Sequence, residues 1–292
     1  MSGVLYSAPG SGLGHLNRAL AVCLELRAMG VEVRIATNSP FAEGMARAAK
    51  FPVVGIAGRR WREDVRALAR EARPDVIVCD TFPGGMRGEW EEGLPARGVY
   101  LARRLNSEGV RALAAGGRWQ KGMRQVVALE TLSADHEAAL GESGVAVRRL
   151  SGPVRLKPGR VATAAPRELM EKLEGGRTTL VVHGGPVAEV ERLVELAGRG
   201  GEVAVIAPWA MPGLGVPVFE YYPAGNVLEL AVRVVSGAGY NMMADMVERP
   251  ERHVPVAFER RWDDQAGRLA AGCQERGDGA REAAEAIREM VA

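Results

Sequence analysis

Three closely spaced glycines followed by a histidine lie near the N-terminus, in the run from Gly10 to Arg18. The run connects an apolar stretch over residues 4–8, which predicts a buried strand, to apolar residues at helical spacing over residues 16–29. Glycines at such a junction let the backbone approach a ligand, and a helix N-terminus offers free N–H groups. His15 stands where a dinucleotide-binding G-x-G-x-x-G pattern needs a glycine. Because imidazole titrates near neutrality, the loop predicts acid–base chemistry more than nicotinamide binding.

A second candidate is an aspartate at the end of an apolar strand. The stretch 75–80 ends in Asp80 and is followed by a turn at Pro83. If the first and fourth strands are neighbours, this carboxylate lies at the same sheet edge as His15. It could then orient the imidazole and stabilise its protonated form. The alternative is an ordinary aspartate that caps the turn.

Two glycine-rich turns follow strands in the second half of the chain. His183 is followed by Gly184 and Gly185, between an expected strand over residues 178–183 and an expected helix over residues 187–197. Backbone N–H groups in such a turn can bind a phosphate. The second turn runs from Ser236 to Asp245 and places Gly237, Gly239 and Asn241 before an acidic residue about one helical turn inside a helix.

An acidic–amide pair opens a further helix after the expected strand over residues 253–258. Asp264 and Gln265 follow Trp262 and Asp263 at this point. Two glycine turns and such a pair at successive strand ends predict a site for a nucleotide that carries a sugar. The alternative for this pair is a helix N-cap with a polar first turn.

The elements that must position these residues alternate between strand and helix, which predicts α/β units on parallel sheets. Strands are expected near residues 3–8, 31–37, 52–57, 75–80, 98–102, 125–129, 178–183, 202–207, 216–219, 233–236 and 254–257. Helices are expected near 14–29, 41–49, 61–73, 134–142, 187–197 and 280–291. Glycines and prolines between Ser151 and Arg177 break this rhythm, as a linker does.

The pattern predicts two Rossmann-like, doubly wound domains that face each other across a cleft. We expect an N-terminal domain over residues 1–154, a linker over 155–177 and a second domain over 178–278. A closing helix over 279–292 is expected to pack back on the first domain.

Composition is that of an ordinary globular protein, with 292 residues, 47% hydrophobic and 25% charged residues. Residues 1–150 contain 21 Lys and Arg against 16 Asp and Glu, whereas residues 151–292 contain 17 against 20. This asymmetry favours an anionic partner for the first half. Cys23 and Cys79 fall in predicted core positions, and Cys273 lies far from both. This cysteine usage and the lack of a signal or membrane-spanning segment predict a cytoplasmic protein without a metal site.

The first loop resembles the G-x-G-H-x-x-R signature of GT-B glycosyltransferases. The resemblance extends to their family 28 and UDP-glycosyltransferase group, which includes the enzyme that adds N-acetylglucosamine to the lipid-linked peptidoglycan precursor. It implies that His15 deprotonates an acceptor hydroxyl with help from Asp80, and that Gly12, Gly14 and Arg18 form the acceptor-side loop. The implied donor-binding residues are Gly184, Gly185, Gly237, Gly239, Asn241, Asp245, Asp264 and Gln265. Gly237 stands where the plant-type members often have histidine.

The resemblance implies a metal-independent, inverting transfer of a sugar from a UDP-sugar to an acceptor hydroxyl, with no cofactor besides this co-substrate. Two alternatives stay open. One is a UDP-sugar hydrolase of the nonulosonic-acid type, which shares the fold and the loop, and the other is a sugar-nucleotide-binding protein without turnover. Basic residues between Arg103 and Arg124 are typical of a solvated face, and the alternative is a peripheral contact with the inner membrane face or a lipid-linked acceptor. They are Arg103, Arg104, Arg111, Arg118, Lys121 and Arg124. Nucleic acid is not expected as a partner, because no recognised module accompanies them.

Overall fold

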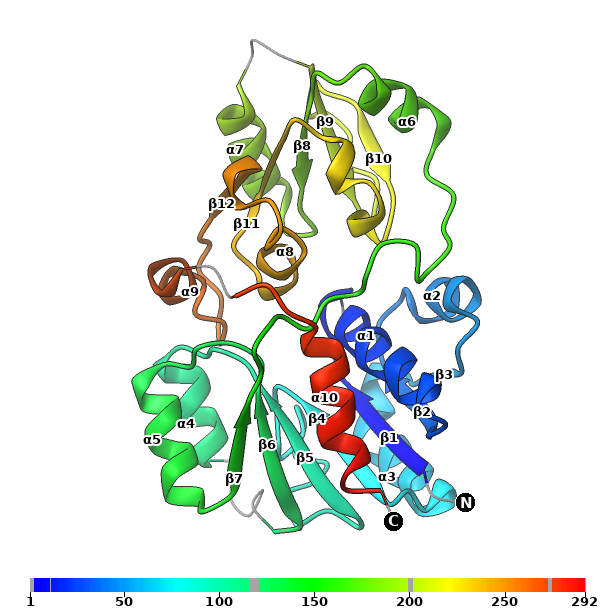
Figure 1. Cartoon of the computed structure of the whole chain (residues 1–292), viewed down its shortest axis with the longest axis vertical. Helices are drawn as coiled ribbons and strands as arrows, with labels where there is room; N and C mark the ends of the chain where they lie inside the picture. Colours follow the sequence, from blue (N-terminus) through cyan, green and yellow to red (C-terminus); the bar gives the residue numbers. More distant parts are fainter. Residues whose placement is uncertain (1–2, 11, 116–120, 199–201, 273–274, 292) are drawn as a thin grey trace.

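The computed structural model describes residues 3–10, 12–115, 121–198, 202–272 and 275–291. They form two α/β units, which lie one above the other along the long axis of the molecule (Figure 1). Each unit is built on a parallel sheet. This architecture confirms the predicted pair of doubly wound, parallel-sheet domains.

The first unit has a seven-stranded sheet with the order β3-β2-β1-β4-β5-β6-β7. Its strands are β1 (Gly3–Ala8), β2 (Glu32–Thr37), β3 (Val53–Gly55), β4 (Val76–Asp80), β5 (Arg97–Ala102), β6 (Met123–Ala128) and β7 (Ala146–Arg149). Its helices are α1 (Gly14–Ala28), α2 (Ala42–Ala49), α3 (Trp61–Ala72), α4 (Ser107–Ala115) and α5 (Ala134–Ser143). The first and fourth strands are paired, from Val4 against Val76 to Ser7 against Cys79. The prediction that β1 and β4 are neighbours is therefore confirmed, and the pairing of His15 with Asp80 depends on it.

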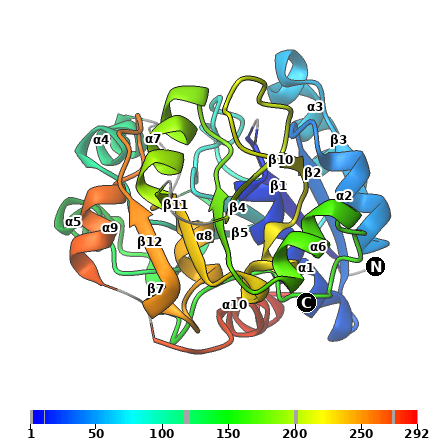
Figure 2. The same ribbon diagram turned by 90° about the horizontal axis from the view of Figure 1, so that it is seen from above.

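The second unit has a five-stranded sheet with the order β10-β9-β8-β11-β12. Its strands are β8 (Thr178–Val182), β9 (Glu202–Ala207), β10 (Val218–Glu220), β11 (Arg233–Gly237) and β12 (His253–Val256). Its helices are α6 (Arg167–Glu174), α7 (Val187–Ala197), α8 (Tyr240–Asp245) and α9 (Gln265–Ala271). Side chains of α7 and α6 enter different apolar clusters, and Figure 2 shows these two helices on opposite sides of the sheet.

The connection between the units differs from the predicted linker. The segment 155–177 contains α6, whose Leu169 and Leu173 are buried in the core of the second unit. Spaced four residues apart, these leucines give a single apolar stripe, which the surrounding prolines and glycines conceal in the sequence. Strand β7 and helix α4 were also not predicted from the sequence.

The last helix, α10 (Gly279–Arg288), lies against α1 of the first unit (Figure 1). Ala280, Ala283 and Ile287 are buried in the same apolar cluster as α1. A Cβ atom at Gly279 would collide with the carbonyl oxygen of Gly152, so glycine is required where the two connections between the units cross.

Cys23 and Cys79 are buried free thiols, as predicted, whereas Cys273 lies outside the described residues. Within the described ranges, no helix is long and apolar enough to cross a membrane.

Candidate active site

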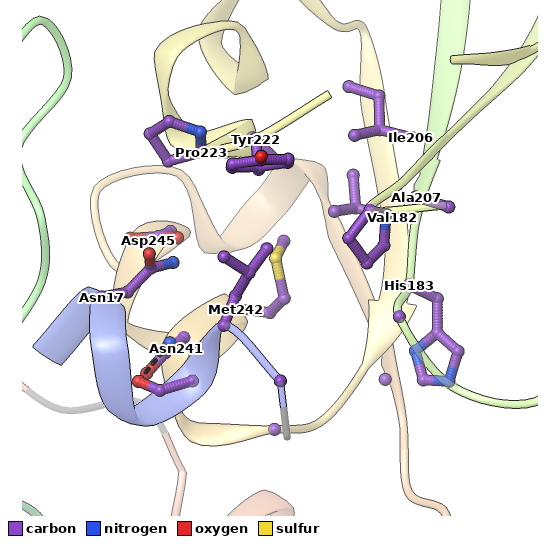
Figure 3. Close-up of a pocket in the computed structure, with 18 of the residues that line it drawn as sticks. Asn17, Val182, His183, Ile206, Ala207, Tyr222, Pro223, Asn241, Met242 and Asp245 are labelled. Atoms are coloured by element: carbon purple, nitrogen blue, oxygen red, sulfur yellow. Dashed lines mark hydrogen bonds between the residues drawn. The ribbon is translucent and has the colours of Figure 1, made fainter. Parts of the chain in front are cut away.

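A cavity of about 290 Å³ lies between the carboxyl-terminal edges of the two sheets. In each sheet the chain order reverses at this edge, between β1 and β4 in the first unit and between β8 and β11 in the second. Loops that leave such a switch point diverge, and ligands of open α/β sheets bind in the crevice that results. Nine of the predicted site residues line the cavity, namely Gly12, Gly14, Arg18, Gly184, Gly237, Gly239, Asn241, Asp245 and Gln265. Figure 3 shows this cavity with Asn17, Asn241 and Asp245 on one side and Val182, His183 and Ile206 on the other.

His15 and Asp80 come together as the strand order implies. Nδ1 of His15 lies 3.3 Å from Oδ1 of Asp80, which ends β4 and is fully buried. Both side chains lie beside the cavity, not among the residues that line it. Burial lowers the pKa of His15 below its usual value, and the charge of Asp80 only partly opposes this. The imidazole is therefore neutral at pH 7, as a general base must be.

Asp80 is held ionised by its surroundings. Burial alone would raise the pKa of this carboxyl group, but Arg18 and His15 outweigh burial and hold it well below its usual range. The guanidinium of Arg18 reaches both oxygens, with NH2 2.8 Å from Oδ1 and Nε 3.3 Å from Oδ2. Tyr6 donates a further hydrogen bond to Oδ2 at 3.2 Å. These donors supply the hydrogen bonds that a buried carboxylate needs.

The residue after Asp80 has a strained backbone. Thr81 has a φ of +70°, in the left-handed region that β-branched residues rarely adopt. Its hydroxyl group donates to Oδ1 of Asp80 at 2.9 Å, and its N–H donates to the carbonyl oxygen of Leu101 at 3.1 Å. Such strain persists only where the surroundings enforce it, and it clusters at functional sites. Here it aims the hydroxyl group at the carboxylate.

The loop over residues 237–241 of the second unit, the predicted donor loop, contacts the glycine loop of the first. Asn241, at the start of α8, donates from Nδ2 to the carbonyl oxygen of Gly14 at 3.1 Å and accepts from NH1 of Arg18 at 3.2 Å. Tyr240 beside it accepts a hydrogen bond from the N–H of Val154 at 2.8 Å. The two predicted halves of the site are thus joined directly.

Two polar side chains that line the cavity have oxygen atoms without a hydrogen-bond partner among the described residues. Oδ1 of Asn17, from α1, is buried and unpaired. Asp245, from α8, is half-buried, and burial raises the pKa of its carboxyl group to about 7 although the charge of Arg155 opposes this. Figure 3 shows both side chains at the same end of the cavity. Asn17 was not predicted as a site residue, because nothing in the sequence distinguishes it from other polar residues of a first helical turn.

His183 occupies the space beside Gly237. A Cβ atom at Gly237 would lie 2.8 Å from Cε1 of His183, and a Cβ atom at Gly185 would collide with the same ring. Nε2 of His183 lies 2.6 Å from Glu189, which Arg260 also contacts. Burial lowers the pKa of His183, although Glu189 opposes this. Gly237 stands where plant-type members often have histidine. Because glycine has no side chain, it leaves room for the imidazole of His183, which directly follows the neighbouring strand β8.

Asp264 and Gln265 have separate environments. Asp264 caps α9 through a hydrogen bond from the N–H of Gly267 at 2.8 Å, and its other oxygen lies 2.7 Å from Nε of Arg104. Its side chain therefore has the capping role that the sequence left open as the alternative. Gln265 lines the cavity, its Oε1 accepts from the N–H of Phe258 at 3.0 Å, and its side chain also forms a hydrogen bond with Asp263.

The basic segment from Arg103 to Arg124 does not form a single exposed face. Arg103 and Arg104 lie in the interface between the units, where they contact Asp263 and Asp264. The side chains in this segment that face solvent include Arg111, Lys121 and Arg124, and Arg118 lies outside the described residues. The alternative of a membrane contact stays a prediction that rests on the exposed residues. Among the described residues, no three His, Cys, Asp or Glu side chains meet as a possible metal site.

Two parallel-sheet units face each other, and a ligand-sized cavity lies at the switch points of their sheets. Comparison with solved structures identifies this fold as GT-B. Spinosyn rhamnosyltransferase SpnG matches with a TM-score of 0.61 at 15% identity, over 99% of this chain and 91% of that chain. Glycosyltransferase SsfS6 of Streptomyces sp. SF2575, complexed with thymidine diphosphate, matches with a TM-score of 0.60 at 14% identity, over 99% and 86%.

Glycosyltransferase SnogD from Streptomyces nogalater matches with a TM-score of 0.58 at 18% identity, over 99% of this chain and 95% of that chain. No protein-family model matches the sequence, and no curated protein matches it. The likeness thus lies in the fold, as the resemblance of the glycine–histidine loop implied.

Proposed function

We propose that this protein is a metal-independent, inverting glycosyltransferase that moves a sugar from a pyrimidine nucleoside diphosphate sugar to an acceptor hydroxyl group. The sequence favours UDP as the nucleotide. The thymidine diphosphate bound to SsfS6 supports a nucleoside diphosphate of this kind. GT-B likeness supports transfer of a sugar in general, and the residues of this chain support the finer assignment.

The observation that carries the proposal is the pair of unpaired acceptor oxygens in the cavity. Oδ1 of Asn17 is buried without a donor, and the carboxyl group of Asp245 beside it has no hydrogen-bond partner among the described residues. The ribose of UDP supplies two such donors in its vicinal hydroxyl groups, the deoxyribose of TDP supplies one, and a bare anion supplies none. The glycine loops at Gly184 and Gly239 border the same cavity and offer backbone N–H groups to a diphosphate.

In this reaction His15 accepts the proton of the acceptor hydroxyl group as that oxygen attacks the anomeric carbon. Asp80 stabilises the imidazolium that forms. The bond from the anomeric carbon to the diphosphate breaks, and the loops of the second unit stabilise the negative charge that develops on the leaving group. Attack from the side opposite the leaving group inverts the anomeric centre.

Calorimetric titration with UDP, TDP and GDP tests the donor site. We expect one of the pyrimidine diphosphates to bind, and Asp245→Ala and Asn17→Ala to weaken that binding while the proteins stay folded. A hydrogen bond to a charged group contributes about 1.5–3 kcal/mol, so Asp245→Ala should reduce affinity about tenfold or more. Asp135→Asn, an exposed change on α5, is the control. Unchanged affinity in folded Asp245→Ala protein would refute the site, and retained activity in EDTA would support metal independence.

One observation favours hydrolysis as a second candidate function. The side chain of His15 is only 17% exposed, and its ring stacks on Phe82, which in turn contacts Trp262 from the second unit at 5.0 Å between ring centroids. Asn106 holds the Trp262 loop to the first unit through its backbone N–H at 2.9 Å. Little room is left beside the imidazole, so water is a suitable acceptor. Product analysis separates the functions, because a glycoside forms only by transfer, free sugar only by hydrolysis, and neither without turnover.

A further inference from the structure

Arg18 lies between His15, Asp80 and Asn241. Its side chain is only 2% exposed. One edge of the guanidinium contacts Asp80, and NH1 donates to Oδ1 of Asn241 in the donor loop at 3.2 Å. NH2 also lies 3.2 Å from Nδ1 of His15, with hydrogen-bonding geometry. Arg18 is among the residues that line the cavity, so a ligand there can reach it.

The contact between Arg18 and His15 restricts where the imidazole carries its proton. A guanidinium has only donor N–H groups, so it can bond to Nδ1 only when Nδ1 presents a lone pair. In a neutral imidazole the proton then lies on Nε2. An imidazole with a proton on Nε2 cannot accept another one there. The nitrogen that would serve as the base is therefore blocked.

The competing arrangement is disfavoured by what Asp80 already binds. For Nε2 to carry the lone pair, Nδ1–H must donate to Oδ1 of Asp80, which lies at ion-pair distance, 3.3 Å. That oxygen already accepts from NH2 of Arg18 at 2.8 Å and from the hydroxyl group of Thr81 at 2.9 Å. The contacts that Oδ1 of Asp80 already accepts thus favour the blocked tautomer while Arg18 stays in place.

We propose that Arg18 is a positioning residue that holds His15 in the tautomer unable to act as a base, and that a nucleoside diphosphate in the cavity releases it. This inference rests on the proposed function. The diphosphate is a stronger partner for the guanidinium than a neutral ring nitrogen, because it is itself charged and can accept two parallel N–H bonds from the guanidinium. Arg18 then turns away from Nδ1 toward the cavity.

The tautomer exchange that follows is balanced in protons and charge. Nε2 gives its proton to water, and Nδ1 takes a proton from water and donates it in a hydrogen bond to Asp80. The imidazole is neutral before and after. His15 thereby becomes competent as a base only when the donor site is occupied. Asn241 in the donor loop binds Arg18, so this loop links occupancy of the donor site to the position of Arg18.

Nitrogen-15 NMR of the imidazole rings tests this directly, because the chain has four histidines and His15→Gln identifies one of them. At about pH 8, where an unperturbed imidazole is neutral, the ligand-free protein should carry the His15 proton on Nε2. Saturation with UDP or TDP should move it to Nδ1. The same exchange should occur without nucleotide in Arg18→Met, which cannot donate, and Arg47→Met, on the exposed face of α2, is the control.

The outcomes separate this inference from the proposed function. A ligand-free protein with the proton already on Nδ1, or a tautomer that saturating nucleotide leaves unchanged, would overturn the role of Arg18 while nucleotide binding stands. If no nucleoside diphosphate binds in calorimetry, the proposed function and the release step both fail. The ligand-free spectra still decide whether Arg18 sets the tautomer, and the wild-type measurement remains decisive if Arg18→Met does not fold.

Discussion

The unpaired carboxyl group in the cavity should cost the folded protein stability in a pH-dependent way. Burial raises the pKa of Asp245 from an ordinary 3.8 to about 7 in the folded state. Between about pH 4 and pH 7 the folded state therefore retains a proton that the unfolded state has released. The free energy of unfolding falls as pH rises through this window and stays lower above it. Asp245→Asn removes the titration, so the variant should not show this fall.

The size of the effect follows from the pKa difference. At 1.36 kcal/mol per pKa unit, the full difference would correspond to roughly 4 kcal/mol above pH 7. Asp245 is half-buried and keeps part of its surface accessible to solvent, which reduces this cost, so we expect about 1–3 kcal/mol. For a protein of this size, 1 kcal/mol changes Tm by about 2–4 °C. Asp245→Asn should therefore raise Tm by about 2–12 °C at pH 8 and by almost nothing near pH 4.

Thermal unfolding from pH 4 to pH 8 measures this difference, with Asp135→Asn as an exposed control that should change little at any pH. The pH dependence of the difference in Tm matters more than its size at one pH. The other titratable groups are the same in both proteins, so their contributions to stability cancel. A constant difference across the range, or a variant less stable than wild type at pH 8, would refute the reasoning. If Asp245→Asn stabilises the protein and also weakens nucleotide binding, the Asp245 carboxylate lowers stability but contributes to ligand binding.

Further predictions concern the polar groups between the units. His15→Ala should lower turnover about 10²–10⁴-fold with the calorimetric affinity for nucleotide nearly unchanged, because general-base catalysis contributes on that scale; near-normal turnover would mean that His15 only fills space. Asp80→Asn leaves the buried Arg18 without its carboxylate and should cost about 3–5 kcal/mol in denaturant unfolding. Because the pKa of Asp80 is depressed in the folded state, this cost should shrink as pH falls below about 4. Glu130→Ala removes the buried partner of Arg268 and should cost about as much, whereas an unchanged Tm would show that this pair is dispensable.

Sequence reasoning predicted the parts of the fold and site that depend on local patterns. The strand before Gly10 and the helix after it follow from apolar spacing, and parallel strands bring their carboxyl ends to one edge. Asp80 could therefore be placed beside His15 once their two strands were taken as neighbours. Arg18 was predicted only as a loop residue, although it contacts both, because its direction depends on the tertiary packing of α1.

The rest depends on contacts between segments far apart in the sequence. Asp264 caps α9 in its own segment, and the approach of Arg104 from the first unit engages its other oxygen as well. His183 fills the space next to Gly237 because β8 and β11 are neighbours, a relation that spacing along the chain does not encode. Asn17 gains significance only because Asp245 lies at the same end of the cavity.

The interface between the units is polar because orientation matters more there than stability. Arg268 bonds to both Glu130 of the first unit and Asp263 of its own, and these side chains are almost fully buried. Buried ion pairs of this kind rarely stabilise a protein more than apolar residues of the same volume would. Their hydrogen bonds are directional, however, so they fix one relative position of the units. In that position Asn241 reaches both Gly14 and Arg18, and the loop that would bind the donor contacts the residue that controls the base.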